Sequence, residues 1–100
     1  MLEASAEAVK LGHGKSREDL AADRTLQLAL ARLIEIVGEA ASRIPGEDRQ
    51  RFPVIPWADI IGMRNRLVHA YMDTDLDVLL GTIEEDLPAL IPHLEAALRG

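Results

Sequence analysis

The residues of this chain that could carry out chemistry gather in one stretch, Met63 to Tyr71, which we call the motif segment. Arg64 supplies a permanent cation with a planar guanidinium. His69 can exchange a proton near neutral pH, and Tyr71 offers a hydroxyl that can react or be modified. Polar chemistry this dense, in a chain otherwise rich in leucine and alanine, indicates a function beyond packing.

Helical geometry constrains how these side chains could cooperate. On a regular helix Arg64 and His69 point about 140° apart, whereas Tyr71 returns to the face of Arg64 two turns later. This arrangement does not favour a tight pair within one helix. It suits a cleft where two helices meet, or a helix that frays by His69. The alternative is a surface arginine, a histidine that caps a helix end and a tyrosine that packs its ring.

Composition predicts one small helical domain over residues 1–100. Apolar residues make up 48% of the chain and aromatic residues only 3%, so the core must be aliphatic. The net charge of −6 disfavours a broad phosphate-binding surface, so RNA binding would need local charge from Arg64 and Arg66. The absence of cysteine rules out disulfides and thiolate metal sites. With no apolar run that could cross a bilayer and no signal-peptide pattern, we expect a cytoplasmic protein.

Apolar spacing and capping residues define the elements that must position the motif segment. They predict an all-α fold, a small up-and-down bundle of four main helices plus short helical turns. Pro56 is expected to begin the helix that carries the motif segment to about Ala70, and Pro88 and Pro92 should kink or break the last helix. The remaining expected elements are a helix over 2–11, a turn from Ser16 to Ala22, a long helix that Asp23 caps and Pro45-Gly46 ends, a turn over 47–52, and a final apolar stripe from Leu76 to Leu98.

Two residues in the middle of the long helix attract attention. Gly38 costs roughly 1 kcal/mol relative to alanine inside a helix, so it should permit a close contact with another helix. Glu39 could point into the same junction and pair with an arginine, or it could be an ordinary exposed glutamate.

We expect no metal and no cofactor. No pair of histidines with a carboxylate has the spacing of metal ligands, and His13 and His93 should be solvated. Asp73, Asp75 and Asp77 lack the glycine and the distal glutamate of a calcium loop, so capping explains them better.

The chain resembles the HepT toxin family of the HEPN superfamily over nearly its whole length. Arg64-x4-His69-x-Tyr71 is similar to the Arg-x4-His-x-Tyr signature of that family, with Asn65 after the arginine. Relative to the family, we expect the chain to lack a turn or two of the first helix, and Gly81 stands where larger residues are common. The further matching segments are Asp23-Arg24, Ile36 to Ala40, Ile55 to Trp57, and Glu85 to Leu94.

The resemblance implies a metal-independent endoribonuclease toxin whose active site is composed by a homodimer. His69 would accept or donate a proton, Arg64 would hold the scissile phosphate of the RNA, and Asn65 would orient that phosphate or hold the helix end. Arg66 would add positive charge for RNA, and Glu39 is a possible supporting residue.

The resemblance also implies a partner, a minimal nucleotidyltransferase antitoxin that attaches AMP to Tyr71 and so competes with RNA for Arg64. An alternative is a non-catalytic helical subunit that docks a nucleotidyltransferase and presents nucleotide or substrate to it. The net acidity and small size of the chain favour this alternative slightly. A purely structural adaptor would leave the motif segment unexplained.

Overall fold

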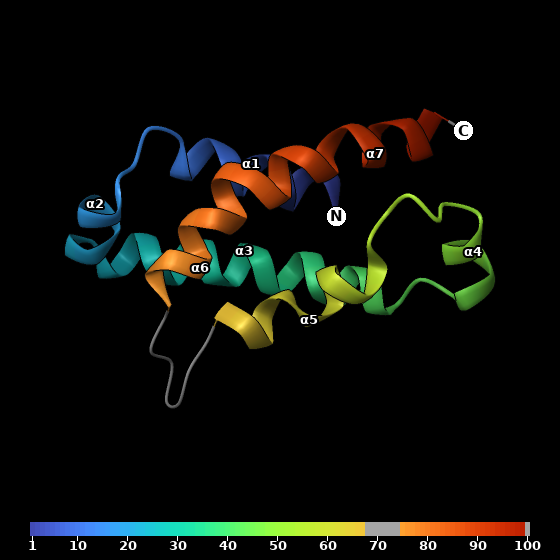
Figure 1. Ribbon diagram of the computed structural model, residues 1–100, viewed down its shortest axis with the longest axis horizontal. Coiled ribbons are helices and arrows are strands. Elements are labelled where there is room, and N and C mark those ends of the chain that lie inside the picture. Colours follow the sequence, from blue (N-terminus) through green and yellow to red (C-terminus); the bar gives the residue numbers. More distant parts are fainter. Residues whose placement is uncertain (68–74, 100) are drawn as a thin grey trace.

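The computed structural model describes residues 1–67 and 75–99, and for Arg64 the backbone only. Every regular element within these residues is helical, which confirms the predicted all-α fold. Figure 1 shows α3 along the length of the molecule, with α1 and α7 on one side and α5 on the other. The elements in chain order are α1 (Leu2–Gly12), α2 (Arg17–Ala22), α3 (Arg24–Ser42), α4 (Gly46–Gln50), α5 (Trp57–Leu67), α6 (Leu76–Gly81), the π-helical segment η2 (Thr82–Asp86) and α7 (Leu87–Arg99).

Side-chain caps begin three of these helices, as the sequence predicts. Ser16 and Asp19 form a reciprocal capping box at the start of α2. Asp23 accepts from the Leu26 amide and opens α3, and Asp75 accepts from two amides at the start of α6. These bonds satisfy amide donors that lack partners inside the helix.

The core is aliphatic, as the composition requires. Helix α3 buries the side chains of Leu30, Ile34, Val37 and Ala41, and the final stripe is mostly buried from Leu79 to Leu94. Leu98 ends that stripe with 75% of its surface exposed. The largest fully buried apolar side chains are Leu20, Leu30, Ile34, Val37, Ile60, Leu67, Leu79 and Leu87.

The last helix is distorted just before Pro88, where a kink or break is expected, but the chain stays helical there. The segment η2 joins α6 to α7, and the Leu87 amide donates to the carbonyl of Thr82, five residues earlier. A wider π turn relieves the clash between a proline ring and the preceding turn. Pro92 lies inside α7, so of the kink or break predicted there the break does not occur. In Figure 1 the run from α6 to α7 bends as one continuous ribbon.

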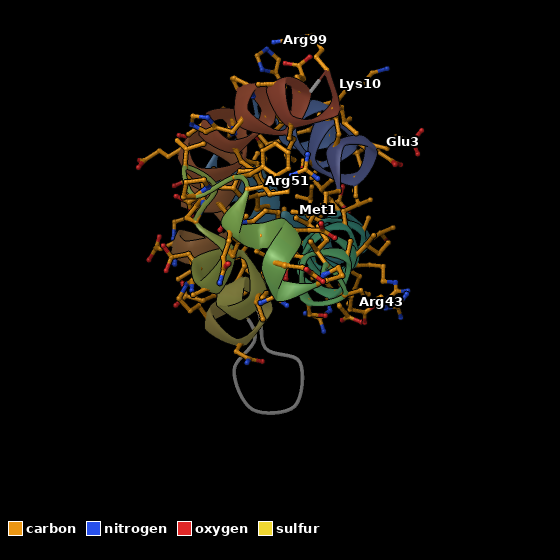
Figure 2. The ribbon with its side chains drawn as sticks, turned by 90° about the vertical axis from the view of Figure 1, so that its right-hand side faces the viewer. Met1, Glu3, Lys10, Arg43, Arg51 and Arg99 are labelled. Atoms are coloured by element: carbon orange, nitrogen blue, oxygen red, sulfur yellow. The ribbon has the colours of Figure 1, made fainter. Side chains whose placement is uncertain are left out.

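A network of backbone acceptors fixes the entry to α5. The indole nitrogen of Trp57 donates to the carbonyls of Arg49 and Phe52, at 3.0 and 3.1 Å. Arg49 in turn donates to the carbonyls of Ile44 and Ser42 at the end of α3. Figure 2 looks onto this end of the molecule, where Met1 and Arg51 lie centrally and Arg43 and Arg99 lie at the edge. The start of α5 is thereby tied to the end of α3.

Candidate functional site

Helix α5 contains the first residues of the motif segment, from Met63 to Leu67. Gly38 lets this helix approach α3 closely. A Cβ atom at Gly38 would lie 3.2 Å from the carbonyl oxygen of Ile60 and 3.6 Å from that of Ile61. The prediction that Gly38 permits a close helix contact is therefore confirmed. Met63 and Leu67 are buried on the same helix, so the backbone of α5 is held firmly where it carries Arg64.

The far end of α5 meets the start of α6. The Leu67 carbonyl accepts a hydrogen bond of 2.9 Å from the Asp75 amide, and Asp75 is also the residue that caps α6. The two described residues that flank the interval 68–74 are therefore held together. His69 and Tyr71 belong to this interval and lie outside the described residues, as does the predicted continuation of the helix to Ala70.

The described candidates Asn65 and Glu39 lie on different helices, α5 and α3. Asn65 is exposed on α5, next to the backbone of Arg64. Glu39 is also exposed, and its carboxylate lies 4.0 Å from Arg32 of the same helix. This placement is the one that the exposed-glutamate alternative predicts, because the α5 junction lies on the side of Gly38.

Arg66 folds back along its own helix. Its Nη2 donates to the carbonyl of Asp59 over 2.9 Å, and its Nη1 lies only 3.2 Å from where a Cβ atom of Gly62 would be. The missing side chain of Gly62 thus leaves room for the guanidinium of Arg66. In this position Arg66 lines a groove between α5 and the η2–α7 run.

That groove was not predicted from the sequence. It has a volume of about 460 Å³, and Asp59, Glu85 and Asp86 contribute carboxylates to its lining. His93, expected to be solvated, is partly buried there. The sequence does not predict the groove because its residues come from separate helices, and the sequence pattern does not specify how those helices pack.

Two features are absent from the residues that the structure describes. No group of three histidine, aspartate or glutamate side chains among them lies close enough together to hold a metal ion. No helix within the described ranges is both long and apolar enough to span a membrane.

Comparison with known proteins finds one family along the chain. The family model described as "Ribonuclease HepT-like" matches residues 1–97. The "Probable ribonuclease HepT" of Thermococcus cleftensis is 41% identical over 93 residues, covering 89% of this chain and 84% of that protein. The "Putative RNase TTE0752" of Caldanaerobacter subterraneus subsp. tengcongensis is 35% identical over 86 residues, covering 86% of this chain and 77% of that protein. No solved structure matches.

Proposed function

Since the chain belongs to the ribonuclease HepT-like family, we propose that it is an endoribonuclease toxin of a toxin–antitoxin pair. The family match over residues 1–97 is the observation that carries this proposal. The packing of α5 supports it, because a helix fixed at Gly38 and Trp57 presents the backbone of Arg64 and Asn65 from a rigid base.

The chemistry proposed for the motif segment is internal transfer at an RNA phosphodiester. The 2′ oxygen attacks phosphorus, the bond from phosphorus to the 5′ oxygen breaks, and the products are a 2′,3′-cyclic phosphate and a 5′ hydroxyl. His69 takes the proton of the 2′ hydroxyl or gives one to the leaving oxygen. Arg64 holds the phosphate and stabilises the charge of the transition state, with Asn65 orienting it. No step in this route requires a metal ion.

We place the active site in a homodimer cleft. Arg64 and His69 diverge by about 140° on a regular helix, so two copies of the motif segment can supply what one copy cannot. Each chain then contributes one His69, which allows one imidazole to accept a proton while the other donates one. Arg66 would add charge to this cleft after leaving the Asp59 carbonyl that now holds it.

The experiment that tests the nuclease proposal is cleavage of RNA by purified protein in the presence of a chelator. Arg64→Ala should lower the cleavage rate by at least about a hundredfold, since a phosphate-holding charge contributes on that scale. Arg43→Ala removes an exposed arginine at the far end of α3 and should leave the rate unchanged. A folded Arg64→Ala variant that cuts RNA at the full rate would exclude the proposal.

Silencing is proposed to occur at Tyr71 by transfer of AMP from a nucleotidyltransferase antitoxin. Tyr71 is the sole tyrosine of the chain, so any adduct on a tyrosine must be on this residue. Coexpression with the nucleotidyltransferase should raise the intact mass by one or more AMP units, and Tyr71→Phe should abolish the increase. An unchanged mass, or an adduct that survives in Tyr71→Phe, would contradict this part of the proposal.

The second candidate function is a non-catalytic subunit that docks a nucleotidyltransferase. The formal charge of −6 favours it, because RNA phosphates are repelled by a net negative protein. It predicts tight binding of the nucleotidyltransferase with no RNA cleavage at any pH, so the chelator assay separates the two functions.

A further inference from the structure

The groove between α5 and the η2–α7 run has an apolar floor and acidic walls, and we call it the acidic groove. Ile60, Met63 and Leu90 form the floor and are only 1%, 4% and 3% exposed. Val54 stands at the groove with 61% of its surface exposed. A volume of about 460 Å³ is enough to take a few side chains of a bound partner.

Three acidic residues line this space, from both walls. Asp59 comes from α5, and Glu85 and Asp86 come from η2. None of the three carboxylates forms an ion pair or hydrogen bond with the part of the chain that the structure describes. The π turn that carries Glu85 and Asp86 is a feature often found at functional sites.

The cation in the same groove does not neutralise these charges. The Nη2 of Arg66 donates its hydrogen bond to the backbone carbonyl of Asp59 and not to a carboxylate. The three carboxylates and the one guanidinium together carry a formal charge of −2 (−3 + 1). The acidic groove therefore repels RNA phosphates and attracts cations.

The apolar lining narrows the kind of cation that fits. A small hydrated ion gains nothing from the exposed apolar residues Val54, Pro56 and Ala89, whereas lysine and arginine can lay their methylene stems on that surface and keep their charge among carboxylates. An apolar anchor beside them would pack on the same residues. Both properties occur together in basic amphipathic segments of proteins.

We propose that the acidic groove is a docking site for a basic segment of a partner protein, one with a leucine- or methionine-sized anchor flanked by lysines or arginines. Complementary charge would steer the segment to the groove, and burial of the anchor would hold it there. The proposal goes beyond nuclease activity and does not depend on it, because the groove is described entirely from residues outside the interval 68–74.

The test uses the absence of cysteine from the chain. Ala89→Cys places a single thiol at the groove, and Ala6→Cys places one on the exposed side of α1 as a control. Each thiol carries a fluorine label, and its 19F signal is followed during titration with a synthetic peptide, Lys-Lys-Leu-Leu-Lys-Lys, or with a peptide whose lysines are replaced by glutamates. We expect a saturable shift at position 89 with the lysine peptide only, and none at position 6.

Charge-removing variants locate the site on the two walls. Glu85→Gln combined with Asp86→Asn should weaken the peptide affinity about tenfold, the effect of losing two ion pairs. Asp59→Asn on the opposite wall should weaken it severalfold. The matched control, Glu3→Gln combined with Glu7→Gln on α1, makes the same change in net charge and should alter affinity less than about twofold.

Four results would overturn the docking proposal. These are no saturable shift at position 89, equal binding of the glutamate peptide, equal weakening by the groove and α1 variants, or a shift at position 89 caused by an RNA oligonucleotide instead of the lysine peptide. Since the asparagine and glutamine variants preserve side-chain size at exposed positions, circular dichroism should show that they remain folded.

Discussion

Gly38→Ala sets two opposing effects against each other at the contact between α3 and α5. Helix propensity favours alanine by about 1 kcal/mol at an interior position. The new Cβ, however, would lie 3.2 Å from the carbonyl oxygen of Ile60 and 3.6 Å from that of Ile61. Both are backbone atoms of another helix, so α5 must move by a few tenths of an ångström, and overpacking of this kind costs roughly 1–3 kcal/mol. The net expectation is a loss of about 0–2 kcal/mol in unfolding free energy.

Gly81→Ala is the matched control, because Gly81 is also helical, with φ −61° and ψ −39°. No described atom outside its own helix and neighbours lies within 4 Å of its Cβ position. Alanine should therefore stabilise the protein here by roughly 0.5–1 kcal/mol. The two variants should differ by about 0.5–3 kcal/mol in unfolding free energy, measured by urea unfolding followed by circular dichroism.

A second readout connects this contact to the motif segment. In an α-helix the Ile60 carbonyl accepts from the amide four residues later, which is that of Arg64. Gly38→Ala should shift the amide NMR signals along α5, and Gly81→Ala should not. If Gly38→Ala stabilises the protein as much as Gly81→Ala does, α3 does not hold α5 through this close contact.

Three further predictions follow from single contacts. Ser5→Ala should raise the unfolding free energy or leave it unchanged, since the fully buried hydroxyl of Ser5 has no hydrogen-bond partner among the described residues. A loss of more than about 1 kcal/mol in unfolding free energy, measured by urea unfolding, would contradict this prediction. Trp57→Phe removes the donor that reaches the carbonyls of Arg49 and Phe52 and should cost about 1–2 kcal/mol, measured in the same way. Hydrogen bonds from the backbone and hydroxyl of Ser16 lower the pKa of Asp19 in the folded state. The ionised carboxylate of Asp19 therefore stabilises the folded protein above about pH 4, and this contribution is lost as the pH falls through the lowered pKa. Asp19→Asn should therefore flatten the acid side of the urea midpoint plotted between pH 2 and 5, and an unchanged acid profile would refute this role.

Local rules predicted much of the fold because they depend on near neighbours in the sequence. Ser16, Asp23 and Asp75 act as caps through bonds to amides within three residues, so their roles could be read from spacing alone. Gly38 was informative because a glycine inside a helix is costly without a compensating contact. The disturbance at Pro88 was expected, but its form as a π turn depends on how α6 and α7 both pack on the core.

The candidate site was less predictable, for reasons that its residues make clear. The side chain of Arg66 can fold back onto the carbonyl of Asp59 because Gly62 has no side chain in the way. The residue types between Asp59 and Arg66 do not by themselves predict this contact. The acidic groove joins Asp59 to Glu85 across two helices. Spacing along one segment cannot supply such a relation, and resemblance to a family suggested roles only for residues of the motif segment.

The most direct test of the nuclease account is the rate of RNA cleavage in a chelator by wild-type protein, His69→Ala and His13→Ala. His13 is exposed in the turn after α1, so its replacement controls for the loss of a histidine elsewhere. If the chain is this nuclease, we expect cleavage by the wild type and by His13→Ala, and a rate at least about a hundredfold lower for folded His69→Ala, because a lost proton-transfer group has an effect of that size. Equal rates for folded His69→Ala and wild type, or no cleavage by the wild type, would contradict it.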